Sequence, residues 1–201
     1  MRGEVKNFKA ELREQVDASQ NPAVNLASQG VDKLFSETGQ ALAVKEMKKY
    51  DPEFDLEELL YEAEEIFQEF YCNYLTGNDE YLQLICGSTA GAQIQALIEG
   101  RRKEGWKYKY DEVLTCGPTF FMGAKIQEKL PTFTFTVEVQ EFETREYLGK
   151  VPENAPPNET GIMQNTYMMV LRRHEEPEIE ITGHYWEIIE FAKVGTSRMI
   201  A

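Results

Sequence analysis

The residues that could carry out catalysis are few and scattered. The sequence contains two histidines, His174 and His184, and lacks a nucleophile elbow, a phosphate-binding loop, an HExxH zinc motif and a dinucleotide-binding fingerprint. An active site needs several polar groups that converge on one point. These residue types and spacings therefore predict a protein that holds partners rather than an enzyme, with no cofactor and no metal ion.

The three cysteines also predict no redox or metal chemistry. Cys72, Cys86 and Cys116 are odd in number, lack CxxC spacing and lie among apolar or small residues. This usage is typical of a reducing compartment, where cysteines do not form a disulfide framework. We expect buried free thiols.

Acidic residues are concentrated in one segment. The chain has 35 acidic and 21 basic residues, a net charge of -14, and twelve of the acidic residues lie between Lys49 and Arg101, where Lys and Arg are absent. Such a charge disfavours direct binding to nucleic acid, because both polymers are anionic. One helix face in this segment is a candidate surface for a basic partner, or else a solvated face. Its acidic residues are Glu57, Glu58, Glu62, Glu65 and Glu69.

Basic and aromatic residues alternate directly after this segment. Such a mixture can contact lipid headgroups or nucleic acid, and the acidity of the chain disfavours RNA. The alternative is the basic end of a helix that continues into a strand. The candidate patch consists of Arg101, Arg102, Lys103, Trp106 and Lys107.

Helices must position the acidic face. Apolar residues at helical spacing predict one long helix that begins at Asp55, whose carboxylate can act as the N-cap, and ends at Gly77. A shorter helix to about Ile85 and another from Ser88 to about Lys103 follow. Ahead of Asp55, the sequence predicts shorter amphipathic helices within residues 5–49.

The hydrophobic period changes to two after Gly105. Residues 132–140 alternate strictly between apolar and polar side chains, which predicts a half-buried strand. Residues 164–173 and 185–193 are two further strands, and the segments between them are too short for helical crossovers. We therefore predict an α+β fold in which N-terminal helices pack on an antiparallel meander.

A membrane contact is the other candidate function of the N-terminal part. We divide the chain into an N-terminal helical extension, residues 1–50, and an α+β domain, residues 51–201. No apolar run approaches the ~20 residues needed to cross a bilayer. The amphipathic helices of the extension either lie on a membrane or simply pack on the domain. The candidate contact residues are Lys33, Leu34, Phe35, Leu42, Lys45, Lys48 and Lys49.

Several motifs occur in the order and spacing of a known family. They are NPAV at 21–24, LFSET at 34–38, VKEM at 44–47 and DPEFD at 51–55, and the YLTGN ending of the long helix at 74–78 also fits. With these motifs the chain resembles the C-terminal domain of the Tim44 family, peripheral matrix-side subunits of the presequence translocase of the mitochondrial inner membrane. The family's long basic N-terminal region is absent, which fits either a fragment or a shortened relative.

The resemblance implies a fold and a location. The family's curved antiparallel sheet is wrapped by helices into a cone around an apolar pocket, as in nuclear-transport-factor-two-like domains. It also implies an adaptor on the matrix face of the inner membrane that joins protein subunits of a membrane complex, recruits the matrix heat-shock chaperone and docks on cardiolipin-type anionic lipid. The residues that we expect to line the pocket are Phe133, Phe135, Met169 and Trp186.

Two alternatives remain at this point. A shortened family member could be a structural subunit of a large mitochondrial assembly, either a respiratory-chain complex or a membrane-bound mitochondrial ribosome. Related curved-sheet domains also include small-molecule enzymes that use a carboxylate in the pocket. A pocket containing a buried carboxylate opposite a tyrosine would favour that reading.

Overall fold

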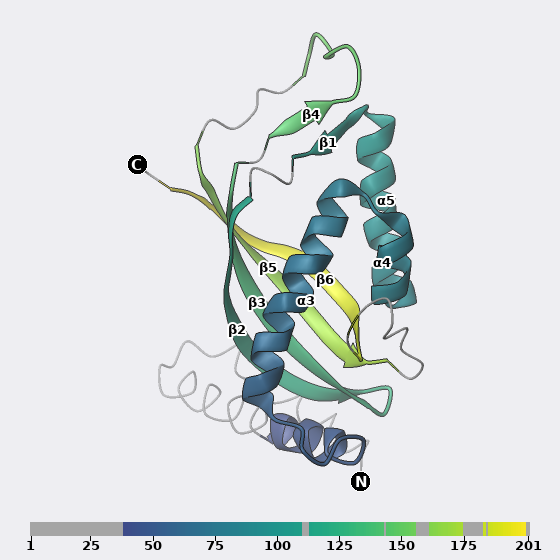
Figure 1. Ribbon diagram of the computed structural model, residues 1–201, viewed down its shortest axis with the longest axis vertical. Helices are drawn as coiled ribbons and strands as arrows, with labels where there is room; N and C mark the ends of the chain where they lie inside the picture. Colours follow the sequence, from purple (N-terminus) through teal and green to yellow (C-terminus); the bar gives the residue numbers. More distant parts are fainter. Residues whose placement is uncertain are drawn as a thin grey trace, which may run out of the picture.

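The computed structural model describes residues 38–109, 113–142, 144–155, 161–174, 183 and 185–199. Helices come first and the sheet follows (Figure 1). The helices are α3 (Leu56–Thr76), α4 (Asp79–Ile85) and α5 (Ser88–Lys103). The strands are β1 (Trp106–Tyr108), β2 (Val113–Gln127), β3 (Leu130–Glu141), β4 (Arg145–Tyr147), β5 (Met163–Arg173) and β6 (Trp186–Arg198). Residues 38–47 are helical as well.

The long helix α3 begins and ends at the predicted residues. The Asp55 side chain accepts a hydrogen bond of 2.6 Å from the backbone N–H of Glu57, which makes it the N-cap. At the other end Gly77 adopts φ 73°, and its N–H donates to the carbonyl of Asn73. A left-handed residue in this position ends a helix at little steric cost only when it lacks a Cβ.

Strands β2, β3, β5 and β6 form one antiparallel sheet in that order, and β1 pairs with β4 in a separate two-stranded ribbon. A row of inward-facing residues crosses the sheet, from Phe121 through Phe135 and Met169 to Phe191. Helix α3 lies across this inner face, while α4 and α5 cover the side on which β6 lies (Figure 1). The sheet and the helices thus form two layers with the core between them.

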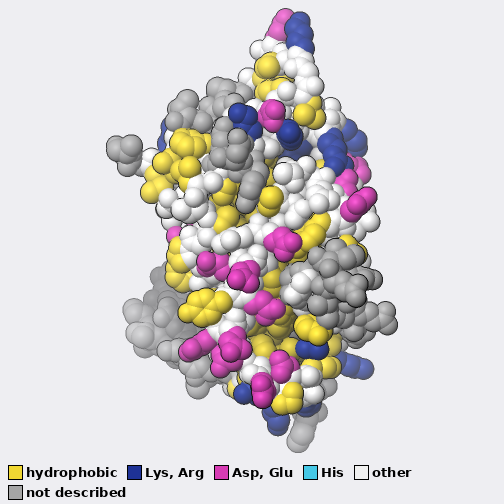
Figure 2. Space-filling view, in the orientation of Figure 1, with side chains coloured by type: hydrophobic (Ala, Val, Ile, Leu, Met, Phe, Trp, Pro, Cys, Tyr) yellow, Lys and Arg dark blue, Asp and Glu magenta, His cyan; other side chains and the backbone are white. Residues whose placement is uncertain are grey.

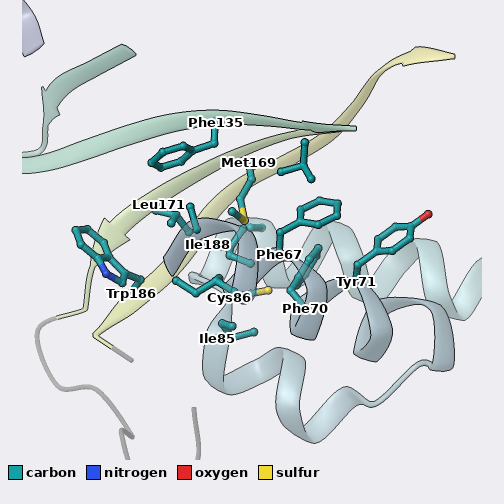
Figure 3. Close-up of a cluster of buried hydrophobic side chains, with 14 of the residues drawn as sticks. Phe67, Phe70, Tyr71, Ile85, Cys86, Phe135, Met169, Leu171, Trp186 and Ile188 are labelled. Atoms are coloured by element: carbon teal, nitrogen blue, oxygen red, sulfur yellow. The ribbon is translucent and has the colours of Figure 1, made fainter. Parts of the chain in front are cut away.

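The core is built by side chains that point from the sheet toward the helices (Figure 3). Phe133, Phe135, Val137 and Val139 alternate along β3 and are fully buried, as the period of two predicts. Phe67 of α3 stacks on Tyr71 with ring centroids 5.3 Å apart and meets Tyr167 of β5 at 5.9 Å. Aromatic contacts therefore fix how α3 sits on the sheet.

The junction between α4 and α5 is joined to the sheet by backbone hydrogen bonds. Cys86 forms a parallel bridge with Ile188 of β6, and the N–H of Gly87 donates to the Ile188 carbonyl at 2.9 Å. The start of β6 is therefore paired on both sides.

The predicted α+β order, with helices on an antiparallel meander, is confirmed. Strands β2 and β4 were not predicted, whereas β1 follows the basic end of α5, as the alternative reading of that segment has it. The helices expected before residue 38 lie outside the described residues. Within helix 38–47, Ala43 and Met47 belong to the same core cluster as α3 and β3.

Candidate functional site

The outer face of α3 is acidic. Glu57, Glu58, Glu65 and Glu69 are exposed, and Glu62 is half-buried. Figure 2 shows acidic side chains spread over this part of the molecule. We call the five residues the acidic face. It also holds Tyr61, whose side chain is 76% exposed, so the face offers a large amphipathic ring among the carboxylates.

The N-terminal end of the acidic face borders a small hollow of about 100 Å³. Its lining includes four carboxylates, two strand residues and the residue directly before β6: Asp51, Asp55, Glu58, Glu62, Arg173, Trp186 and Tyr185. Burial raises the pKa of Glu62, a hydrogen bond with the Trp186 side chain lowers it, and the negative charge of Glu65 raises it further, so that the net shift is upward.

The raised pKa of Glu62 makes stability depend on pH. In the folded state Glu62 binds its proton more tightly than in the unfolded state. The contribution to stability is thus fully present below the unfolded pKa, about 4.5, and is lost as the pH rises through the folded pKa. We expect Glu62→Gln to remove this dependence. The variant should therefore melt at a higher temperature than the parent protein at pH 7, and the difference should be smaller at pH 4. Thermal unfolding at both pH values measures it, with exposed Glu153→Gln, which is not among the causes of the shift, as the control. Parallel pH profiles for the two variants would contradict the assignment.

The residues of the candidate basic and aromatic patch are close together, but most of them are engaged within the fold. Arg101 is only 8% exposed, donates to the carbonyl of Tyr74 at 3.0 Å and stacks on the rings of Tyr74 and Tyr108, at 4.6 and 5.1 Å. Arg102 pairs with Asp79 at 2.6 Å and bonds the Gly77 carbonyl. These two arginines therefore join the ends of α3 and α5.

The other members of this patch are two exposed lysines and a half-buried tryptophan. Lys103 is exposed, 3.9 Å from the Glu99 carboxylate. The indole of Trp106 donates to Glu104, and Lys107 pairs with Glu146 across the ribbon at 3.2 Å. The patch thus contains both buried cations that hold the fold together and exposed ones. The sequence alone did not show which were which.

The candidate membrane contact is only partly within the described residues. Lys33, Leu34 and Phe35 lie outside them. Leu42, Lys45, Lys48 and Lys49 are exposed along helix 38–47 or directly after it, and Leu42 is 51% exposed. Part of this surface borders a hollow of about 560 Å³, lined by Gln40, Ala41, Val44, Lys45 and Lys48. A lipid contact by these residues stays a prediction.

The residues expected to line an apolar pocket all lie in the core. Phe133, Phe135 and Met169 are fully buried and Trp186 is 5% exposed. Phe133 contacts Trp186 and Phe54 with ring centroids 5.7 and 5.4 Å apart. The side chains are therefore packed against one another, and a pocket for a ligand at this place stays a prediction.

A buried carboxylate that the sequence analysis did not single out lies at the end of β3. Glu141 is 4% exposed, and its two oxygens lie 2.8 and 2.9 Å from the hydroxyl of Tyr71 on α3. Asn165 of β5 donates its amide to the same carboxylate at 2.7 Å, and Thr196 of β6 donates to the amide oxygen of Asn165. Tyr167 lies 2.8 Å from the Tyr71 hydroxyl and 3.3 Å from Glu141.

We call these five residues the Glu141 network: Glu141, Tyr71, Asn165, Tyr167 and Thr196. It joins α3 to three strands of the sheet. Burial, together with the negative charges of neighbouring groups, raises the pKa of Tyr71 far above its ordinary value, so its hydroxyl keeps its proton as a donor. Glu141 continues the alternation that buries residues 133, 135, 137 and 139. The sequence pattern could therefore have predicted that its side chain points inward.

The network has the residue types of an acid–base site, but its carboxylate is buried and bonded from within the fold. Glu141 lines neither of the two hollows described above, nor a third of about 510 Å³ between the start of α5 and β6. Its carboxylate already accepts from Tyr71, Asn165 and Tyr167. These bonds satisfy the polar atoms of a buried carboxyl group, which suits a structural role.

The cysteines are free, as expected. Cys86 is buried, while Cys72 and Cys116 are half-buried. Burial raises the pKa of both Cys86 and Cys116 to about 12, and nearby carboxylates add to the shift. These two thiols are therefore protonated near neutral pH and poor nucleophiles.

Comparison with known proteins supplies the family. None of the helices in the described part of the chain is long and apolar enough to cross a membrane. Among curated proteins no match was found. The Tim44-like domain family matches residues 40–193, which include all of α3 to β5 and the first eight of the thirteen residues of β6. The observed fold, with helices packed on a four-stranded antiparallel sheet, is consistent with that family. The chain therefore belongs to the Tim44-like domain family.

Proposed function

We propose that this protein is a non-catalytic adaptor on the matrix face of the mitochondrial inner membrane. The observation that carries the proposal is the Tim44-like domain match over residues 40–193, together with the helix-on-sheet fold. The adaptor joins protein subunits of an inner-membrane complex and recruits the matrix heat-shock chaperone. Residues 1–50, ahead of the long helix, contribute a contact with cardiolipin-type lipid through Leu42 and the lysines that follow it.

The Glu141 network supports a binding role over an enzymatic one. A carboxylate opposite a tyrosine is the arrangement that a small-molecule enzyme of this fold would use. Here the carboxylate is bonded by residues of α3 and β5, and none of the three hollows reaches it. A general base must lie within hydrogen-bond reach of its substrate.

The acidic face is the contact that we assign to a basic partner. Four of its five carboxylates are exposed, and Lys and Arg are absent from residues 50–100. A helix with one cationic and one apolar face would place its basic side chains against Glu57, Glu65 and Glu69 and its apolar side chains near Tyr61. Charge complementarity of this kind speeds association and selects the partner.

Charge reversal of the acidic face tests this contact. We expect Glu57→Lys/Glu65→Lys/Glu69→Lys to weaken binding of a cationic amphipathic helical peptide about tenfold at low salt. High salt should reduce the affinity of the parent protein for the peptide by a similar factor, because salt screens exposed charges. Fluorescence anisotropy of a labelled peptide measures the affinity. A matched variant, Glu99→Lys/Glu153→Lys/Glu190→Lys, carries the same change in net charge at exposed positions elsewhere. Equal loss in both triple variants would show that only total charge matters.

The native partners decide between the adaptor and its alternative. Affinity purification of the full chain from mitochondria, followed by mass spectrometry, would recover translocase and chaperone subunits if the adaptor proposal is correct. A stoichiometric respiratory complex or mitochondrial ribosome would instead identify a structural subunit. Recovery outside mitochondria would overturn both.

A further inference from the structure

The sheet carries apolar side chains on the face that points away from α3. An antiparallel sheet with one solvated face usually has polar side chains there. The residues that alternate with the core residues include Phe120 of β2, Thr134 and Thr136 of β3, Met168 and Val170 of β5, and Ala192 of β6. We call these residues and Met122, at a register shift of β2, the outer face. Charged residues of the same side, such as Arg172 and Glu190, lie at its border.

Part of the outer face is withdrawn from solvent. Val170 is 3% exposed, and Thr132, which points to the same side of the sheet beside it, is 0% exposed. Phe120 and Met122, on the marginal strand, are 47% and 59% exposed. Helix α3 packs on the opposite face of the sheet and does not cover these side chains (Figure 1). Such burial on the central strands is typical of a face on which another segment packs.

The chain ahead of the described residues ends beside the outer face. Helix 38–47 starts next to β2, where a Cβ at Gly39 would lie 3.1 Å from the carbonyl oxygen of Ala124. Ala124 pairs with Phe133, the neighbour of Thr132 on β3. Residues 1–37 are therefore attached to the domain at the margin of the sheet, close to the buried part of its outer face.

The sequence directly ahead of this attachment predicts an amphipathic helix at residues 22–35. Asn21 is a suitable N-cap and Pro22 a suitable first residue. Apolar residues recur on one side at helical spacing: Val24, Ala27, Val31, Leu34 and Phe35. At ~1.5 Å per residue such a helix is about 21 Å long, and four strands ~4.8 Å apart span about 14 Å from first to last. One helix of this length is enough to cross the sheet.

We propose that residues 22–35 form a helix whose apolar side packs on the outer face, over Val170 and its neighbours. Both surfaces are apolar, so their contact removes both from water. The tether favours this occupant over a second copy of the chain, because a short linker holds the segment at an effective concentration of about a millimolar. Leu34 and Phe35 then face the sheet, and the lipid contact of the proposed function is left to Leu42 and the lysines after it. The inference does not depend on the adaptor role.

Photo-crosslinking of the full chain tests the proposal. The photoreactive amino acid p-benzoylphenylalanine replaces Met168, and mass spectrometry of the digested protein identifies the residues that it captures. We expect crosslinks to residues 22–35 of the same chain, both without and with phosphatidylglycerol vesicles. The same label at Leu97, which is exposed on α5, should capture none of these residues. Circular dichroism checks folding, and exposed Met122 is the alternative labelling position on the outer face if the Met168 variant does not fold.

Two matched variants of the segment test whether its apolar side makes the contact. Val31→Asp/Leu34→Asp places two charges on that side and should reduce crosslinking at least about fivefold, because a buried unpaired charge is costly. Asn25→Asp/Gln29→Asp adds the same charge away from the apolar side and should crosslink as the parent does.

Three results would overturn the proposal. Crosslinks that join two chains would assign the outer face to a second copy. Equal crosslinking in both aspartate variants would show that the segment is captured without packing on the sheet. Loss of the crosslinks when vesicles are added would assign Leu34 and Phe35 to lipid. Each of these results leaves the adaptor function standing, since affinity purification from mitochondria tests that function separately.

Discussion

Glu141→Ala is expected to lower the free energy of unfolding by about 3–5 kcal/mol, because it leaves the donors of Tyr71 and Asn165 in the core without their acceptor. Glu141→Gln should cost less. Its amide keeps one acceptor oxygen, and a tyrosine hydroxyl can turn to accept from the new N–H. The amide of Asn165 has less freedom, since Thr196 already bonds its oxygen.

Urea unfolding, followed by far-ultraviolet circular dichroism, measures this effect. The matched control is Glu138→Ala on the same strand, where the half-buried carboxylate accepts from Gln164 at 2.8 Å on the opposite face of the sheet. We expect it to cost less than about 1 kcal/mol. If Glu141→Ala were as stable as Glu138→Ala, the Glu141 network would not be the connection between α3 and the sheet that the geometry indicates.

Arg101→Ala is expected to destabilise the fold by about 2–3 kcal/mol through the loss of its stacking on two tyrosine rings and of its bond to the Tyr74 carbonyl. Arg101→Met should recover part of this loss, because the aliphatic stem also fills space between the rings. Arg101→Lys should recover little, since an ammonium cannot stack as a planar guanidinium does.

The neighbouring arginine provides the comparison. Arg102 is exposed and pairs with Asp79 at the surface, so Arg102→Ala should cost about 1 kcal/mol or less. Thermal unfolding of both alanine variants distinguishes the two roles. Equal melting temperatures would mean that Arg101 is not the structural cation of this end, and that the whole run of basic residues acts as a surface patch.

The elements that follow one clear period were predictable. The helical spacing of α3 with its Asp55 cap, and the strict alternation along β3, give their structures because one face of each element must be buried. Strand β2 follows no such period. Its register shifts near Cys116 and Phe121 interrupt the alternation of side chains, and residues 117 and 123 are glycines. The sequence of β2 therefore lacks the apolar–polar alternation that identifies a strand, although its pairing with β3 is long.

The candidate site was predictable in its charges but not in its contacts. A run of residues without Lys or Arg identifies the acidic face directly, because charge is a property of the sequence. Arg101 is buried and Arg102 is exposed because neighbouring residues on a helix point in different directions. Which of the two is buried depends on the side of α5 that meets the end of α3. Asn165 and Tyr71 lie far apart in the chain, so only the folded sheet could bring them together around Glu141.

The irregularity that concealed β2 also has a protective effect. This strand is at the margin of the sheet, and only one residue of Val113–Gln127, Lys125, is charged, while Phe120 and Met122 are exposed. A flat margin of this composition would attract a second chain and begin an aggregate. Among the described strands β2 pairs only with β3, and its register shifts bend its other edge, so that a straight strand would find fewer consecutive partners there. An edge bent in this way is a poorer template for a second strand than a straight, nearly uncharged one would be.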